Sequence, residues 1–235
     1  VILMLKRIAE VSRMRKKYID NIRWITVVLV VIYHVIYMYN SVETAGVIGT
    51  ICDVRYQDSF QYIVYPWFML LLFTISGMSA RYYLNNHTDK EFVHSRTTKL
   101  LVPSTIGLVV FHWILVYYNM QIAGAFEMMR GVPKPVLALL IIISGTGALW
   151  YIQMLWVFSM ILIWIRKIEK ERFYRLCRKT NVITLIMLTL LVVVSAKVLN
   201  APVIVVYRFG IYSVGFFIGY FCLSHDEVVD RLEKY

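Results

Sequence analysis

Residues 23–41 read RWITVVLVVIYHVIYMYNS, a stretch in which Arg23 and His34 are the only basic residues. A helix of about 20 largely apolar residues is long enough to cross the hydrocarbon layer of a bilayer. Eleven residues advance a helix by about 16 Å and slightly more than three turns, so Arg23 and His34 lie on nearly the same face. The stretch therefore predicts a membrane-spanning helix with a cation at one end and an imidazole about halfway across.

The composition extends this prediction to the whole chain. Hydrophobic residues make up 60% of the 235 positions, and the mean hydropathy is +0.65. These values exclude an ordinary soluble domain and favour an all-α, polytopic integral membrane helical bundle with about six transmembrane helices. The expected spans are residues 23–41, 61–80, 100–118, 148–165, 182–199 and 203–223. The apolar run 136–144 is too short to span and predicts a re-entrant or interfacial helix.

The basic residues predict the orientation. If the N-terminus is cytoplasmic, the inner segments 1–23, 81–99, 166–181 and 224–235 hold 20 of the 25 Lys and Arg residues. Such a bias is typical of cytoplasmic loops. We thus expect a multi-pass protein of the cell (plasma or inner) membrane, with a cytoplasmic basic segment (1–22), a transmembrane domain (23–223) and a cytoplasmic tail or linker (224–235). The net charge of +11 then indicates contact with anionic lipid rather than with nucleic acid.

The three cysteines do not form a metal or redox pattern. Cys52 falls in the first predicted outer loop, whereas Cys177 and Cys222 fall near the inner side. We expect no disulfide, no metal site and no permanently bound cofactor.

Arg23 and His34 favour complementary chemical roles. An interfacial guanidinium binds phosphates with two hydrogen bonds, and a neutral imidazole can take a proton from a hydroxyl group. This geometry suits an elongated donor, such as acyl-coenzyme A, whose phosphates stay at the cytoplasmic face while its reactive end reaches inward. Two plainer interpretations remain: Arg23 is an ordinary inner-face anchor, and His34 hydrogen-bonds a neighbouring helix.

Four motifs in order along the chain resemble the membrane-bound acyltransferase 3 family, whose hallmark is an Arg and a His with ten residues between them on the first helix. Within it, the branch with the periplasmic glucan succinyltransferases is most similar. The matching elements are Asp20-Asn-Ile-Arg23 with His34, Phe73-Thr-Ile-Ser-Gly77, Arg96-Thr-Thr-Lys99-Leu-Leu-Val-Pro103 and Leu149-Trp-Tyr151.

The resemblance implies an integral membrane acyltransferase. It would move an acetyl-type or succinyl-type group from cytoplasmic acyl-CoA, as co-substrate, to a hydroxyl of a carbohydrate or other envelope acceptor. His34 would be the general base, Arg23 with Arg96, Lys99 and Arg81 would hold the donor's phosphates, and Trp150, Tyr151 and Arg208 would lie on the acceptor side.

Two features depart from the family pattern. Lys99 replaces a second Arg, which keeps the charge but loses the two-pronged donor geometry. Family members typically have about ten spanning helices, so this chain is expected to be the N-terminal six-helix portion, incomplete at its C-terminal end.

Other functions stay open for the same residues. His34, His112 and Arg208 could form the polar pathway of a transporter or channel, or the chain could be a non-catalytic membrane component that acts through partners. Arg81, Arg96 and Lys99 also fit an inner loop, Trp150 and Tyr151 fit an interfacial aromatic belt, and Ser76-Gly77 fits a contact between helices.

Overall fold

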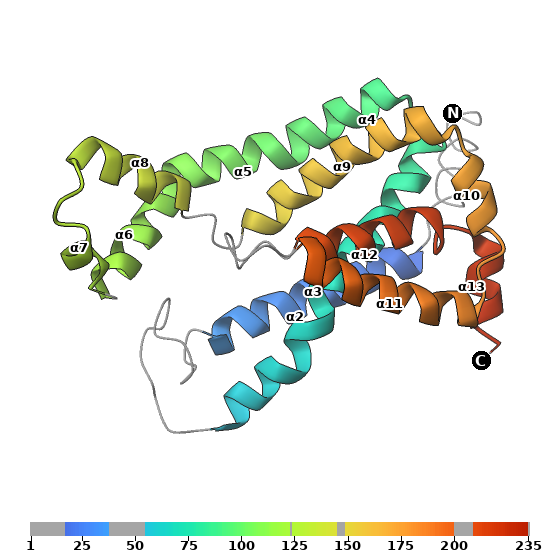
Figure 1. The fold of residues 1–235 in the computed structure, drawn as a ribbon, viewed down its shortest axis with the longest axis horizontal. Coiled ribbons are helices and arrows are strands. Elements are labelled where there is room, and N and C mark those ends of the chain that lie inside the picture. Colours follow the sequence, from blue (N-terminus) through green and yellow to red (C-terminus); the bar gives the residue numbers. More distant parts are fainter. Residues whose placement is uncertain (1–16, 38–54, 123, 145–148, 200–208, 235) are drawn as a thin grey trace, which may run out of the picture.

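The chain folds into helices throughout the part that the computed structural model describes, which comprises residues 17–37, 55–122, 124–144, 149–199 and 209–234; these residues contain no strand. The elements appear in Figure 1. They are α2 (Lys17–Tyr37), α3 (Arg55–Leu84), α4 (Asp89–Arg96), η1 (Thr97–Leu101), α5 (Val102–Gly107), η2 (Leu108–His112), α6 (Trp113–Ile122), α7 (Ala125–Met128), α8 (Lys134–Ser144), α9 (Trp150–Glu169), α10 (Arg172–Cys177), α11 (Val182–Leu199), α12 (Phe209–Phe221) and α13 (Asp226–Leu232).

Four helical stretches of the described residues are long and apolar enough to cross a membrane. They are Lys17–Tyr37, Ser59–Leu84, Asp89–Tyr118 and Trp150–Glu169, and two shorter apolar helices cover Val182–Ser195 and Phe209–Phe221. All six overlap predicted spans, which confirms the all-α membrane bundle. The run 136–144 lies within α8, which has 11 residues and is too short to span.

Most of the predicted inner segment 81–99 is helical. α3 continues to Leu84, and α4 begins directly after Thr88. The Thr88 Oγ1 accepts a hydrogen bond from the Glu91 amide at 3.3 Å, and the Glu91 carboxylate accepts one from the Thr88 amide at 2.7 Å. This capping box satisfies amides that a helix start otherwise leaves unpaired, so the helix starts about eleven residues before the predicted span. It carries Arg96 and Lys99 on a helix rather than in a loop.

The helix that follows is continuous from α4 to α6 but widens at two π-helical turns, η1 and η2. In η1 the Val102 amide donates to the Thr97 carbonyl, five residues back. Pro103 has no amide hydrogen to donate to the Lys99 carbonyl, and its ring crowds that carbonyl. The wider turn relieves this conflict without ending the helix.

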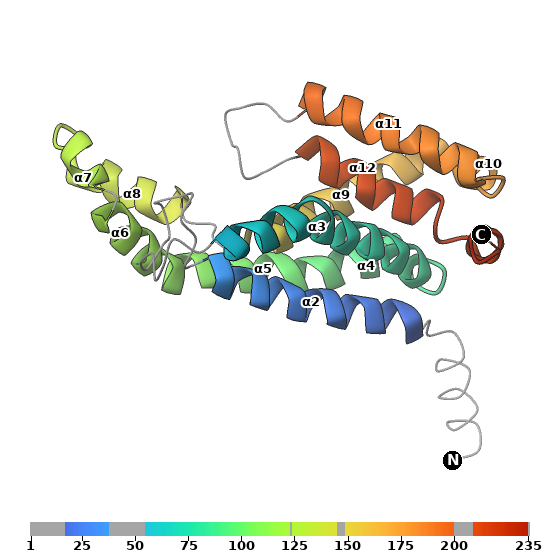
Figure 2. The same ribbon diagram turned by 90° about the horizontal axis from the view of Figure 1, so that it is seen from below.

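The bundle is built in layers around α3. Figure 2 shows α2 on one side of α3, and α12 followed by α11 on the other. η1 and α4 pack on α9, while α6, α7 and α8 form a lobe at one end of the molecule. The core between these helices is rich in fully buried aromatic side chains, namely Phe68, Phe73, Phe92, Phe158, Phe216 and Tyr220.

α3 and α12 approach each other through glycines. A Cβ atom at Gly77 would collide with the backbone of Phe216, and one at Gly219 would collide with the backbone of Thr74. Gly215 and Gly219 form the G-x-x-x-G spacing that lets membrane helices pack backbone to backbone. The interpretation of Gly77 as a residue at a helix contact is therefore confirmed. The same helix, α3, supplies Ser76 and Ser79 to the cavity described next.

Candidate active site

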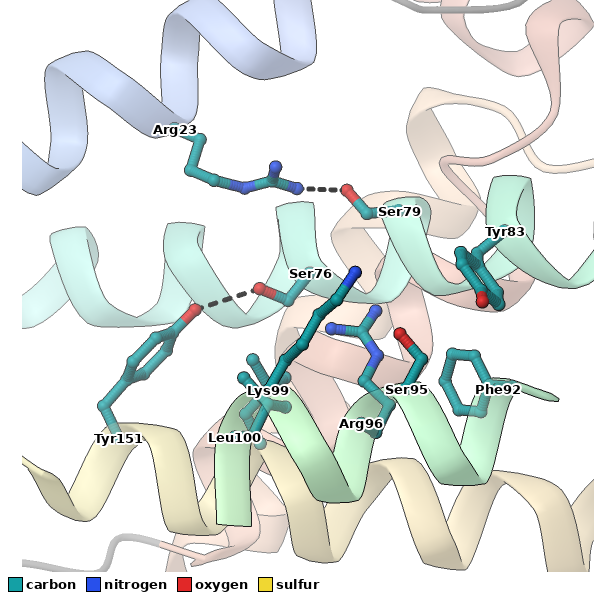
Figure 3. A pocket seen from close by; sticks show the side chains of 11 residues that line it. Arg23, Ser76, Ser79, Tyr83, Phe92, Ser95, Arg96, Lys99, Leu100 and Tyr151 are labelled. Atoms are coloured by element: carbon teal, nitrogen blue, oxygen red, sulfur yellow. Dashed lines mark hydrogen bonds between the residues drawn. The ribbon is translucent and has the colours of Figure 1, made fainter. Parts of the chain in front are cut away.

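A cavity of about 380 Å³ opens between α2, α3, the α4–η1 segment and α9, and its lining combines cations with hydroxyl groups (Figure 3). The basic side chains come from two opposite sides, one from α2 and the others from α4 and η1. The lining residues are Arg23, Ser76, Ser79, Tyr83, Phe92, Ser95, Arg96, Lys99, Leu100, Tyr151 and Leu155.

Arg23 reaches this cavity from the N-terminal half of α2. Its guanidinium donates to the Ser79 hydroxyl on α3, and its Nη1 lies 3.5 Å from the Asp20 carboxylate. The Asp20 contact orients Arg23 from its own helix, at the spacing of one turn. Because 39% of the Arg23 side chain stays exposed, its remaining N–H groups can reach a ligand.

Arg96 and Lys99 face Arg23 from the opposite wall. Figure 3 shows the ends of the three side chains pointing toward one space. Arg96 lies over the Phe92 ring at 5.0 Å, a contact that holds a guanidinium by its flat face. In the described part of the chain no carboxylate forms an ion pair with Arg96 or Lys99. Their charges are thus left for an anion.

Tyr151 forms the other end of the cavity. Its hydroxyl lies 2.9 Å from the Ser76 Oγ and 3.5 Å from the Leu72 carbonyl oxygen, which it reaches from α9 across to α3. Trp150 beside it packs on Phe73 and Tyr212, with ring centroids 6.1 and 5.3 Å apart. Both side chains are half-buried against the core.

His34 does not line this cavity. It lies three turns further along α2, and its Nδ1 is 2.7 Å from the carbonyl oxygen of Val30. Because a carbonyl only accepts, Nδ1 carries the hydrogen, and Nε2 of the neutral ring is left as a basic lone pair. The structure therefore places Arg23 with Arg96 and Lys99 but keeps His34 apart from that cluster.

Arg81 is also absent from the cavity lining, although it was predicted to group with Arg96 and Lys99. Its Nη1 donates to both Glu171 carboxylate oxygens, at 2.7 and 2.8 Å, and to the Tyr220 hydroxyl at 3.2 Å. The guanidinium also lies 3.6 Å from the centre of the Tyr174 ring. Arg81 thus ties α3 to α10 and α12, and a carboxylate already neutralises it.

The remaining predicted residues are not brought to the cavity. Arg208 lies outside the described residues. His112 lies in η2, and its Nε2 is buried without a hydrogen-bond partner among the described residues. An interhelical hydrogen bond is therefore not found there. The cavities at Arg23, at Trp113 and at Asp89 are not lined by His34 or His112.

Ser79 and Ser95 line the cavity but were not predicted as site residues. Ser79 follows Ser76 by three positions, which puts both on one face of a helix. Likewise, Ser95 precedes Arg96 and Lys99 within one helical turn. The spacing of serines around the recognised motifs was thus the signal that could have identified them.

The fold and the cavity together define a multi-pass membrane protein with a cationic, hydroxyl-lined site between its helices. Compared with models of known families, residues 16–233 match the acyltransferase domain of the acyltransferase 3 family. The chain belongs to this family. Searches of curated proteins and of solved structures give no match.

Proposed function

We propose that this protein transfers an acetyl-type or succinyl-type group from cytoplasmic acyl-CoA to a hydroxyl of an envelope carbohydrate. The observation that carries the proposal is the convergence of Arg23, Arg96 and Lys99 on one cavity. Family membership supports acyl transfer in general, and the chemistry of these side chains supports the choice of donor.

The cations favour a donor that carries several phosphates. Coenzyme A has a diphosphate and a separate phosphate monoester, and guanidinium groups bind such oxygens through charge-assisted hydrogen bonds. A cavity of about 380 Å³ accommodates part of such a molecule, leaving the remainder to extend toward either end. Arg23 and Arg96 supply planar forks, and Lys99 supplies a point charge.

The tautomer of His34 supports its role as the general base. With Nδ1–H held by the Val30 carbonyl, Nε2 can accept the proton of the acceptor hydroxyl. The hydroxyl oxygen then attacks the thioester carbonyl, the carbon–sulfur bond breaks, and the imidazolium returns the proton to the coenzyme A thiolate. The acyl end of the donor would reach His34 along the approximately 16 Å of α2 that separates it from Arg23.

We also propose which side of the membrane the N-terminus occupies. The segments rich in Lys and Arg, with 20 of the 25, support a cytoplasmic N-terminus in the cell membrane. The motif order around Ser76 and Pro103 supports the branch of glucan succinyltransferases.

Membranes that contain His34→Ala, Lys99→Ala or Arg23→Ala, each at matched abundance, test the proposal with labelled acetyl- and succinyl-CoA. We expect His34→Ala to abolish transfer while donor binding persists. Lys99→Ala should weaken donor binding about 10-fold or more, as expected when a charged hydrogen bond is lost. Lys134→Ala, which removes an exposed charge far from the cavity, is the matched control. Unchanged transfer by His34→Ala would overturn the role of the base.

A further inference from the structure

A second cavity of about 570 Å³ lies between α4 and α9, apart from the donor cavity. Both cavities share α4 and η1 as a wall, but on different faces. Phe92, Arg96 and Lys99 line the first, at intervals of four and three residues, whereas Lys90, Val93 and Thr97 line the second, at intervals of three and four. The second cavity is lined by Asp89, Lys90, Val93, His94, Thr97, Ile163 and Lys167.

The charges of this cavity favour an anion. Lys90 and Lys167 come from different helices, both are exposed, and neither forms an ion pair with a carboxylate in the described part of the chain. Asp89 is the single acid in the lining, and the Arg166 guanidinium lies 3.6 Å from its carboxylate. The acid is therefore already balanced, and two ammonium groups are left to converge on the cavity.

The apolar part of the lining favours an amphipathic ligand over a free ion. Val93 on α4 and Ile163 on α9 add apolar side chains to the lining. Both helices belong to stretches that are long and apolar enough to span a bilayer, and Trp164, next to Ile163 in the sequence of α9, is exposed. A molecule with a phosphate at one end and hydrocarbon at the other matches this arrangement.

We propose that this cavity binds the phosphate headgroup of an anionic phospholipid. Lys90 and Lys167 hold the phosphate oxygens from two sides, with His94 and Thr97 as additional hydrogen-bonding groups. The acyl chains follow the apolar surfaces of α5 and α9 into the membrane. Basic pockets at the end of a helix pair are suited to lipid headgroups, since each Lys near the surface adds to the attraction.

Native mass spectrometry of the purified full chain tests this proposal with phosphatidylglycerol, phosphatidylcholine and inorganic phosphate as separate ligands. We expect retained phosphatidylglycerol, weaker phosphatidylcholine binding, and no comparable retention of inorganic phosphate. The variant Lys90→Ala/Lys167→Ala should bind phosphatidylglycerol about 30-fold more weakly. The control Lys134→Ala/Lys197→Ala removes the same charge from exposed positions on α8 and α11, which do not line this cavity, and should bind as the parent does.

Three results would overturn the proposal. Equal phosphatidylglycerol binding by the two double variants would show that Lys90 and Lys167 do not form the site. Equal retention of inorganic phosphate would make it a free-anion site. Displacement of the bound lipid by coenzyme A would instead assign the cavity to the acyl donor. None of these readouts depends on acyl transfer, so they are independent of the proposed function.

Discussion

The Tyr151 hydroxyl and the Ser76 Oγ lie 2.9 Å apart, and this hydrogen bond joins α9 to α3 at the end of the donor cavity. Tyr151→Phe removes the bond but keeps the ring. A neutral hydrogen bond contributes about 0.5–1.5 kcal/mol, so we expect a small loss of stability. If the hydroxyl also positions substrate, the rate of acyl transfer falls by more than the small loss of folded protein accounts for. Thermal melting and transfer assays on one preparation separate these effects, and Tyr118→Phe, at an exposed tyrosine, is the control.

Pro103 follows the wide η1 turn that carries Lys99, and its missing amide hydrogen favours that turn. Pro103→Ala restores an amide that can donate to the Lys99 carbonyl, so an ordinary α-helical turn can form. Removal of the extra residue from the turn would rotate Lys99 by about 100° relative to the helix beyond it. We expect weaker donor binding with unchanged or higher thermal stability. Pro135→Ala, in the first turn of α8, should leave donor binding unaltered; equal donor affinity in Pro103→Ala would refute the positioning role.

The Arg81–Glu171 pair is predicted to contribute far more than an exposed pair. Only 13% of the Arg81 side chain is exposed, although Glu171 keeps 39%. Removal of one partner leaves a partly buried charge, which we expect to cost about 2–3 kcal/mol, below the range for fully buried pairs. The Arg130–Glu127 pair also spans 2.7 Å, but its side chains are 76% and 72% exposed, so its loss should cost less than about 1 kcal/mol. Double-mutant cycles in detergent measure both couplings.

Gly219 is predicted to tolerate no side chain. A Cβ atom there meets the backbone of Thr74, which cannot move aside as a flexible side chain can. Gly219→Leu should therefore separate α12 from α3 and lower the amount of folded protein in membranes several-fold. At Gly131, by contrast, a Cβ would meet nothing within 4 Å, and Gly131→Ala is expected to be silent. Monodisperse protein from Gly219→Leu in size-exclusion chromatography would contradict this expectation.

His225 makes stability depend on pH. Burial lowers the pKa of His225, and its Nε2 lies 2.9 Å from the Tyr174 carbonyl oxygen. A lowered pKa means that the folded protein favours the neutral ring, so its contribution is complete above the ordinary value of about 6.5 and is lost as the pH falls below it. We expect the melting temperature to drop between about pH 7 and 5. His225→Gln should flatten that slope; an identical slope would assign it to other groups.

The sequence was a good guide to features that depend on local pattern. Apolar length predicted the position of all six apolar helices, because a bilayer imposes the same requirement on each. Charge and motif order identified Arg23, Arg96, Lys99 and Tyr151, which the fold brings to one cavity. Where the prediction failed locally, at the start of α4, the capping pair Thr88 and Glu91 was a readable but overlooked signal.

Features that depend on tertiary contacts could not be predicted in the same way. Arg81 at the end of α3 is close in sequence to Arg96 at the end of α4, so the sequence grouped the two. In the fold, however, the carboxylate of Glu171, which is 90 residues away in the sequence, neutralises Arg81. The second cavity requires α4 and α9 to be side by side, a pairing that hydropathy does not indicate.

The glycine contact between Gly77 and the Phe216 backbone has a consequence for how the protein is made. These positions are 139 residues apart in the sequence, so α3 enters the membrane long before α12 has been synthesised. Until then, the face of α3 around Gly77 contacts lipid or another occupant. The helix that carries Ser76 and Ser79 gains its contact with Phe216 only when α12 arrives, so a ribosome that stalls before α12 would leave this wall of the donor site without that contact.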